Sequence, residues 1–431
     1  MTADLVIGID ASTTACKAIA WTANGTPVAE GRAPIALSSP LPNYYEQDPA
    51  DWWTACVTAL QGVTRQVDPA RIAGLSITNQ RETIAPVDRD GNALRAGMVW
   101  LDERARDDYL PLAERLGREP DGSETIHAIS GKPVDLIPCS SRLDWMQKVE
   151  PEILAKTHMV LDVQGALVHR LTGEFATSWS SADPLGYFDN RTKEWSKTIL
   201  DACGVRLDQV PRALPPGAEL GRVTAAAAAA TGLREGTPVL AGGGDGQVAG
   251  LGTNALTPER AYLNIGTALV SGIYGKPYRI SKAWRTMGSP TGEGYYYESC
   301  LRSGTFLVTW FVEKVCGVDA LKDPDVFKRL EAEAATVEIG ADGLLMVPYF
   351  LGVMSPYWDA AARGIFVGLS PAHGRGHMYR ALMESLAFEQ AFCTETAEAE
   401  LGYAIKSYVA IGGGALGDRL GSLTPSQHGK N

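Results

Sequence analysis

The chain is 431 residues long, which exceeds one ordinary hydrophobic core and indicates two or three domains. Its composition, 45% hydrophobic and 21% charged, is that of a soluble globular protein. The formal net charge of -11 disfavours binding to nucleic acid or to anionic membranes. It does not exclude a phosphate ligand, because backbone amides and one or two cations can bind phosphate locally.

Neither a zinc site nor a membrane anchor is expected. The seven cysteines are scattered without C-x-x-C spacing, and there are only six histidines. Reduced thiols in a cytoplasmic protein are the simplest interpretation. The N-terminus lacks the basic and apolar regions of a signal peptide. The alanine run 225–230 is too short to span a membrane and predicts a helix.

The N-terminus predicts a β-hairpin. Residues 5–10 have the apolar pattern of a buried strand, residues 12–14 form a polar turn, and residues 18–21 return as a second strand. Asn24-Gly25 then indicates a tight turn. The loop of this hairpin is therefore rich in small and hydroxylated residues.

A helix and another strand follow. Asp48 can cap a helix, and Pro49 suits its first turn. Residues 72–78 predict a strand that ends in the polar cluster 79–82.

A domain boundary is predicted near the middle of the chain. A proline-rich break at 211–217 precedes a short apolar strand at 238–241, which runs into Gly242-Gly243-Gly244-Asp245. We therefore expect an N-terminal domain of residues 1–240 and a C-terminal domain of residues 241–431.

A second hairpin repeats the plan of the first. Residues 261–265 are strand-like, Gly266-Thr267 is the turn, and residues 268–272 return. This weak duplication suggests two similar α/β halves that face each other across a cleft. The two hairpin turns could then hold one phosphate chain between them.

The first hairpin turn is a candidate phosphate cradle. Ser12, Thr13 and Thr14 offer hydroxyls and allow the backbone to approach a phosphate. Lys17 adds a positive charge, and Asp10 at the end of the strand can hold Mg²⁺ directly or through water. The alternative is an ordinary hairpin turn.

Two more glycine-containing turns are candidate nucleotide contacts. Gly266-Thr267 is a second cradle, and Gly412-Gly413-Gly414-Ala415 follows an apolar strand. The latter run does not have the Rossmann or Walker spacing. The alternatives are a plain turn for the former and a flexible turn for the latter.

Asp245 is the candidate catalytic residue. It stands after three glycines, which remove side-chain bulk and would let a substrate hydroxyl come within hydrogen-bonding distance. The alternative is a helix N-cap, because Gly246-Gln247-Val248-Ala249 can open a helix. The pattern at this position favours the cap.

Two groups of residues could line a sugar site. Arg81 and Glu82 place a donor fork beside an acceptor, as a substrate with several hydroxyls requires, and a surface ion pair is the alternative. The stretch 44–48 and the pair Trp52-Trp53 could form a wall of the site, although core packing suits the tryptophans better.

Together these segments resemble the FGGY family of carbohydrate kinases, which includes xylulokinases and glycerol kinases. The match runs in order from Ile7 to about Ala415. Its most specific part begins at 343–349, continues through 355–369 and ends at 377–384. The run Glu46-Gln47-Asp48-Pro49 is also typical of the family.

The resemblance implies two ribonuclease H-like domains of the actin and hexokinase type, with MgATP as phosphate donor. It places Asp10 and Asp245 near Mg²⁺ and makes Asp245 the general base. The residues it assigns to ATP are Ser12, Thr13, Thr14, Lys17, Gly266, Thr267, Gly413, Gly414 and Ala415. Those assigned to the substrate are Arg81, Glu82, Asp245 and Gln247.

The expected substrate is a polyol or a ketose. Residues 77–83 are similar to glycerol kinases, but the tyrosine that those enzymes place in their next loop is missing from residues 131–137. The run of three glycines before Asp245 and the C-terminal signature are more similar to xylulokinases. The sequence therefore leaves glycerol-like and xylulose-like substrates open.

The chain departs from the family after Ala415. It continues to Asn431 as a polar tail unlike the helices that complete the adenine side of the site in the family, so we expect a C-terminal domain shortened at its end. This departure motivates a second hypothesis, a non-catalytic sugar-binding or regulatory protein on a kinase fold. An actin-like ATPase is third. The sequence does not decide the oligomeric state, and a homodimer is compatible with it.

Overall fold

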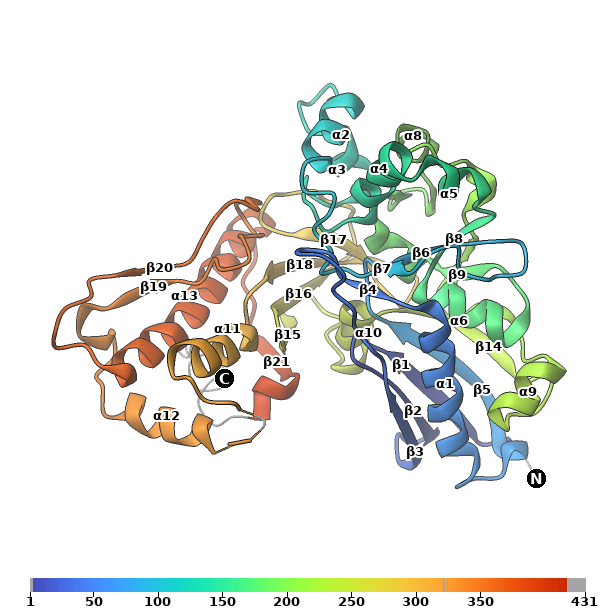
Figure 1. Ribbon diagram of the computed structural model, residues 1–431, viewed down its shortest axis with the longest axis horizontal. Coiled ribbons are helices and arrows are strands. Elements are labelled where there is room, and N and C mark those ends of the chain that lie inside the picture. The colour runs from blue at the N-terminus through green and yellow to red at the C-terminus, as the bar shows by residue number, and fades with distance from the viewer. Residues whose placement is uncertain (1–2, 321, 324, 417–431) are drawn as a thin grey trace. The chain divides into compact units, whose positions relative to one another are not determined.

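The computed structural model describes residues 3–416 apart from 321 and 324, and it consists of two compact units (Figure 1). Unit 1 contains Met1–Val248, Lys276–Arg279 and Thr286–Tyr295. Unit 2 contains Ala249–Gly275, Ile280–Arg285 and Tyr296–Asn431. Asp245 and Gln247, which the sequence-based boundary assigned to the C-terminal domain, therefore belong to unit 1. The expected shortened C-terminal tail lies mostly in 417–431, outside the described residues.

Unit 1 is built on a six-stranded sheet in the order β13-β14-β5-β1-β2-β3. Its strands are β1 (Leu5–Ala11), β2 (Ala15–Thr22), β3 (Pro27–Pro34), β5 (Ile72–Asn79), β13 (Glu219–Arg222) and β14 (Pro238–Gly244). β1, β2 and β3 form an antiparallel meander, whereas β5 runs parallel to β1 and β14 runs parallel to β5. The predicted N-terminal hairpin and the two later strands are confirmed, and β14 extends through all three glycines.

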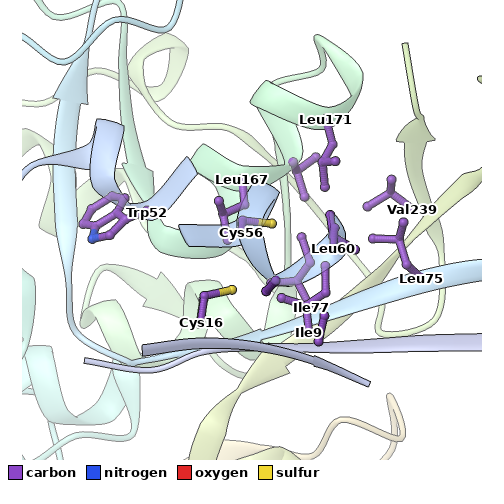
Figure 2. Packing of buried hydrophobic residues seen from close by; sticks show 14 of the residues in the cluster. Ile9, Cys16, Trp52, Cys56, Leu60, Leu75, Ile77, Leu167, Leu171 and Val239 are labelled. Carbon is purple, nitrogen blue, oxygen red and sulfur yellow. The ribbon is translucent and has the colours of Figure 1, made fainter. Parts of the chain in front are cut away.

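Helices cover one face of this sheet. The three that supply buried side chains to its core are α1 (Pro49–Thr64), α6 (Val163–Thr172) and α9 (Ala225–Thr231). Figure 2 shows Cys56 of α1 and Leu167 of α6 packed near Ile9 and Ile77 of the sheet. Because side chains alternate along a strand, Asp10 lies on the opposite face of β1 from Ile9. As predicted, Asp48 caps α1, accepting a hydrogen bond from the backbone N–H of Ala50 at 2.9 Å.

A second sheet of unit 1 lies between two hydrophobic cores. Its order is β4-β7-β6-β8, with bounds β4 (Glu46–Gln47), β6 (Ile84–Val87), β7 (Gly97–Met98) and β8 (Met159–Asp162). Ile84 and Val160 belong to one core, whereas their neighbours Ala85 and Leu161 belong to the core beneath α1. This two-sided burial explains why both strands are apolar at nearly every position.

The other elements of unit 1 surround the second core or connect the sheets. The helices are α2 (Tyr109–Leu116), α3 (Thr125–Ser130), α4 (Cys139–Val149), α5 (Pro151–Lys156), α7 (Trp179–Ala182) and α8 (Lys197–Ala202). The short strands form two pairs, β9 (Ala176–Ser178) with β12 (Arg212–Leu214) and β10 (Phe188–Asp189) with β11 (Glu194–Trp195). The 3-10 turns are η1 (Pro69–Arg71), η2 (Asp183–Leu185) and η3 (Leu207–Gln209).

Most of a five-stranded sheet with the order β17-β18-β16-β15-β21 belongs to unit 2. Its strands include β15 (Arg260–Ile265), β16 (Leu269–Gly275), β18 (Tyr295–Leu301) and β21 (Ser407–Ile411). The helices are α11 (Thr305–Trp310), α12 (Val326–Ala335) and α13 (Arg375–Leu401). Between them lie the π-turn η4 (Phe311–Val315), the 3-10 turn η5 (Ala341–Gly343) and the hairpin of β19 (Leu345–Val347) and β20 (Ile365–Val367). The 3-10 turn η6 (Gly413–Leu416) follows β21. α10 (Asp245–Gly252), β17 (Arg285–Gly288) and β18, through its first residue Tyr295, each straddle the division between the units.

The two sheets share a plan. β15 pairs antiparallel with β16 and parallel with β21, as β1 pairs antiparallel with β2 and parallel with β5. The predicted second hairpin and the predicted duplication of an α/β, ribonuclease H-like unit are therefore confirmed. In the part of the chain that the structure describes, no helix has both the length and the apolar character needed to cross a bilayer.

The contact between α1 and β3 predicts one strong effect on stability. A Cβ atom on Gly31 of β3 would lie 2.0 Å from the carbonyl oxygen of Ala59 in α1. We expect Gly31→Ala to lower the free energy of unfolding by at least about 2 kcal/mol, because α1 must move away from the sheet. Urea denaturation would measure this change.

A matched control is Gly8→Ala in β1 of the same sheet. The nearest atom to its new Cβ would be Nε1 of Trp21 at 3.8 Å, which is an ordinary contact. This variant should stay within about 0.5 kcal/mol of the unmodified protein. Equal losses for both variants would contradict the importance of the backbone contact.

Candidate active site

Three parallel strands of unit 1 bring the predicted polar residues to one edge of the sheet. Asp10 of β1 is in register with Thr78 of β5, and Thr78 is in register with Gly243 of β14. Arg81 follows the end of β5 and Asp245 follows the end of β14 directly. The carboxyl ends of parallel strands are where α/β sheets bind ligands.

Asp245 is the first residue of α10, and it remains accessible. Its Oδ1 accepts a hydrogen bond from the backbone N–H of Gly246 at 2.7 Å and lies 3.0 Å from Nε of Arg81. Oδ2 takes part in neither contact, and the side chain is 49% exposed. The cap-like contact and an accessible carboxylate oxygen therefore coexist.

The glycines around Asp245 make room for Arg81. A Cβ atom on Gly244 would lie 2.6 Å from Cγ and Cδ of Arg81, and one on Gly246 would lie 2.8 Å from its Cζ. The sequence predicts that the three glycines before Asp245 clear space for a substrate hydroxyl. In the structure Gly242 lies against the carbonyl group of Ile77 and Gly243 against the side chain of Ser180, and Arg81 fills the space beside Gly244. Gly244 and Gly246 therefore allow Arg81 to reach the candidate base.

Arg81 and Glu82 are not a surface ion pair, because both are buried, at 8% and 4% exposure. Glu82 has a φ of +48°, which is unusual for a residue with a side chain. The fully buried Arg142 donates from Nη2 to the carbonyl oxygen of Glu82 at 2.7 Å and so holds this strained turn. Both residues of the predicted sugar contact are thus fixed by the interior of unit 1.

One carboxylate oxygen of Asp10, Oδ1, is buried. It accepts no hydrogen bond from the described residues. Burial, and then the negative charge of Asp245, raise the pKa of Asp10 to about 6. Among the described residues, which are 3–416 except 321 and 324, no three His, Cys, Asp or Glu side chains are grouped so that they could hold a metal ion. The two carboxylates nevertheless fit Mg²⁺, which takes one or two carboxylates together with water and phosphate oxygens.

The first hairpin loop turns its carbonyl groups into the protein. The carbonyl oxygen of Thr13 accepts from Nε2 of Gln47 at 2.6 Å, and that of Thr14 accepts from the N–H of Ile35 at 2.9 Å. The N–H groups of Thr13 and Thr14 donate to no described residue. A loop with engaged carbonyls and unengaged amides is suited to bind an anion.

The second hairpin loop, in unit 2, is built in the same way. The carbonyl oxygen of Gly266 accepts from the N–H of Thr305 at 2.9 Å, and that of Thr267 accepts from the N–H of Gly304 at 2.7 Å. The N–H groups of Thr267 and Ala268 have no acceptor among the residues the structure describes. The plain-turn alternative does not explain this shared arrangement.

The glycine run after β21 packs on the second hairpin. Gly412 has a φ of +89°, and a Cβ atom there would lie 2.7 Å from the carbonyl oxygen of Ile265. Gly413, Gly414 and Ala415 then form the 3-10 turn η6. Unit 2 therefore brings Gly266, Thr267 and this segment together at the end of β15.

Two predicted residues are partly engaged elsewhere. Lys17 lies beside Asp10 in register, but its Nζ is 3.3 Å from Glu30 on a partly exposed surface. Gln247 is fully buried, and its Nε2 donates to the carbonyl oxygen of Ser180 at 2.9 Å and to Oδ2 of Asp183 at 3.2 Å. Its Oε1 accepts no hydrogen bond from the described residues.

The aromatic stretch near residue 50 is mostly structural. Trp52 is fully buried in the core beneath α1, as the core-packing alternative predicts, and the ring of Trp53 lies 5.6 Å from the guanidinium of Arg170. Trp100 also contacts the first hairpin loop, because its Nε1 donates to Oγ1 of Thr13 at 2.9 Å. Nothing in the local sequence pattern distinguishes Trp100 from a core tryptophan.

Comparison with known families covers nearly the whole chain. Residues 5–252 match the N-terminal domain of the FGGY family of carbohydrate kinases, and residues 261–423 match its C-terminal domain.

Individual relatives include enzymes with different substrates. A xylulose kinase of Bacillus subtilis is 28% identical over 417 residues, covering 96% of this chain and 81% of that protein. A glycerol kinase of Thermococcus onnurineus is 27% identical over 428 residues, covering 96% and 82%. The crystal structure of a xylulose kinase from Rhodospirillum rubrum superimposes with a TM-score of 0.86 at 27% identity, covering 97% and 84%.

The buried carboxyl of Asp10 predicts a pH-dependent effect of Asp10→Asn. Since its folded-state pKa of about 6 exceeds the ordinary 3.8, the protein loses stability as the pH rises through 6 and Asp10 ionises. The neutral amide of the variant avoids this loss. In EDTA, the stability of Asp10→Asn relative to the unmodified protein should rise by about 1.4 kcal/mol between pH 5 and pH 8, because about one pH unit of this range lies below the folded-state pKa.

Asp4→Asn is the control for this measurement. Arg71 lowers the pKa of Asp4 below 3.8, so Asp4 is ionised in both the folded and the unfolded state throughout this range. Its stability difference should therefore stay constant. A constant difference for Asp10→Asn as well, measured by urea denaturation at each pH, would contradict the raised pKa assigned to the buried Asp10.

Proposed function

The chain belongs to the FGGY family of carbohydrate kinases, and from this premise we propose that Asp245 is the general base that activates the hydroxyl of its sugar or polyol substrate. The protein is an ATP-dependent carbohydrate kinase, a phosphotransferase with an alcohol group as acceptor. The observation that carries the proposed role is the half-exposed Asp245 carboxylate, held through Oδ1 by Arg81 at the strand edge that also carries Asp10.

The chemistry asked of Asp245 is one proton transfer. Its carboxylate accepts the proton of a terminal hydroxyl while the oxygen attacks the γ-phosphorus of ATP and the bond to the β-phosphate oxygen breaks. Arg81 orients the carboxylate, since its Nε lies 3.0 Å from Oδ1. Because Oδ2 is outside that contact, it is the oxygen we assign to the substrate.

Asp10 and Asp245 would hold Mg²⁺, which supplies charge neutralisation for the phosphates when it is bound. The buried Oδ1 of Asp10, which no described residue satisfies, supports this role. It also gives a reason for placing two mutually repelling carboxylates together.

We assign the phosphates to the two hairpin loops. The unengaged N–H groups of Thr13 and Thr14 in unit 1 and of Thr267 in unit 2 support this assignment. Ser12 and Lys17 complete the first loop, Gly266 completes the second, and Gly413, Gly414 and Ala415 are assigned to adenosine.

The substrate we propose is a ketose or polyol that is phosphorylated on a terminal hydroxyl. Arg81 and Glu82 are the proposed contacts to its other hydroxyls. Gln247 stays a proposed substrate residue through its Oε1 alone, because its amide nitrogen is engaged. The names of the relatives include both xylulose and glycerol kinases, so both classes belong in a test.

No observation favours the non-catalytic alternative. It rested on the polar C-terminal tail, most of which lies in 417–431 outside the described residues. A homodimer and a cytoplasmic location stay predictions.

The first test is ADP release from MgATP over a panel of ketoses and polyols. We expect at least one ketopentose, ketohexose or short polyol to stimulate release well above the rate without sugar. A folded protein that responds to no member of the panel would count against the proposed substrate class.

The second test is Asp245→Asn. We expect turnover to fall by about 10²- to 10⁴-fold, because the amide cannot accept the proton, while calorimetry still detects the sugar. Asp208→Asn, which changes an exposed carboxylate bonded to Arg206, should leave turnover within about twofold. Turnover of Asp245→Asn close to that of Asp208→Asn would remove Asp245 from the mechanism.

A further inference from the structure

The two hairpin loops differ in what engages their carbonyl groups. In unit 2, the carbonyl oxygen of Thr267 is held by the backbone N–H of Gly304 at the start of α11. In unit 1, the corresponding carbonyl oxygen of Thr13 is held by a side chain, Nε2 of Gln47, at 2.6 Å. A side chain of β4 therefore performs in one unit what the backbone performs in the other.

Gln47 is rigidly held where it meets the loop. It is 1% exposed, and its Oε1 accepts from Nε1 of the fully buried Trp52 at 2.9 Å and from Nε2 of Gln80 at 2.7 Å. With its Nε2 donating to Thr13, the amide uses both of its ends. Because Trp52 belongs to the capped first turn of α1, the position of Gln47 is set by the core of unit 1.

Gln47 also joins the two loops that flank the site. Gln80 immediately precedes Arg81, and the backbone N–H of Gln80 donates to the carbonyl oxygen of Ala11 at 2.9 Å. A continuous set of hydrogen bonds therefore runs from the segment that carries Arg81, through Gln47, to the backbone of Thr13. Phosphoryl transfer depends on such relative placement, and errors of about 1 Å can cost on the order of 10²-fold in rate.

We propose that Gln47 is a positioning residue for phosphoryl transfer, which turns the carbonyl of Thr13 inward so that the N–H groups of Thr13 and Thr14 face the phosphates of the nucleotide. The inference rests on the proposed function, since it deepens the role assigned to the first loop. Gln47 itself touches neither the nucleotide nor the sugar. Its loss should therefore act on nucleotide binding and on turnover rather than on sugar binding.

Two variants remove the bond to Thr13 in different ways. Gln47→Glu keeps an acceptor for Trp52 and Gln80 but turns a carboxylate oxygen toward the carbonyl of Thr13. Gln47→Asn adds no charge and withdraws the amide by one methylene. If one variant does not fold, the other still tests the proposal.

Gln209 provides a matched control. It is also 1% exposed, its Nε2 donates to the carbonyl oxygen of Thr157 at 2.8 Å, and its Oε1 accepts from the N–H of Arg206 at 3.0 Å. Arg206 directly precedes η3 and Thr157 directly follows α5, and neither residue belongs to a hairpin loop. Gln209→Glu and Gln209→Asn therefore reproduce the general cost of disturbing a buried glutamine.

The experiment compares nucleotide affinity with sugar affinity in each variant. Calorimetry with MgADP and, separately, with the sugar found by the substrate panel gives two dissociation constants, and steady-state kinetics gives kcat/KM for MgATP. For the Gln47 variants we expect MgADP affinity and kcat/KM for MgATP to fall at least about tenfold, with sugar affinity changed less than about threefold. The Gln209 variants should change all three quantities less than about twofold.

Two outcomes would overturn the proposal. One is unchanged MgADP affinity and kcat/KM in a folded Gln47 variant. The other is a loss of sugar affinity as large as the loss of MgADP affinity, which would make Gln47 a general structural residue. If no sugar is phosphorylated by the unmodified protein, the proposed function fails, yet MgADP affinity still decides the role of Gln47.

Discussion

The parallel alignment of β1, β5 and β14 determines where the reactive groups of unit 1 lie. The strands are neighbours in the sheet, and their register places Asp10, Thr78 and Gly243 side by side. All three strands therefore end at one edge, so that Asp245 comes close enough to Asp10 to raise its pKa. The site thus depends on backbone pairing between segments separated by more than two hundred residues of sequence.

Close packing around the glycines of β14 adds the second constraint. Arg81 reaches the Asp245 carboxylate only because Gly244 and Gly246 have no side chains. A buried arginine is costly unless it is paired, and the ion pair satisfies that requirement while it orients the candidate base. Gly244 and Gly246 therefore leave room for Arg81, the neighbour that contacts the candidate base.

The duplicated hairpins show that a loop with engaged carbonyl groups and unengaged amides can be stabilised in two ways. Both loops engage their carbonyl groups and leave amides without described acceptors. Unit 2 uses backbone donors for this, whereas unit 1 uses the backbone N–H of Ile35 for Thr14 and the side chain of Gln47 for Thr13. An acidic protein can in this way prepare to bind a polyphosphate with oriented peptide dipoles and few cations. The formal net charge of -11 is therefore no obstacle to a nucleotide site.

The sequence by itself determined the elements whose signals are local. The hairpins at 5–21 and 261–272, the Asp48 cap and the repeated strand-turn-strand plan follow from alternation of apolar residues and from turn chemistry, which act over a few residues. The tertiary structure alone decided that Asp245 is both anchored and accessible, that Arg81 is buried against it, and that Gln47 holds Thr13. These contacts join residues far apart in the chain, and no local pattern records which distant side chain will fill a given space.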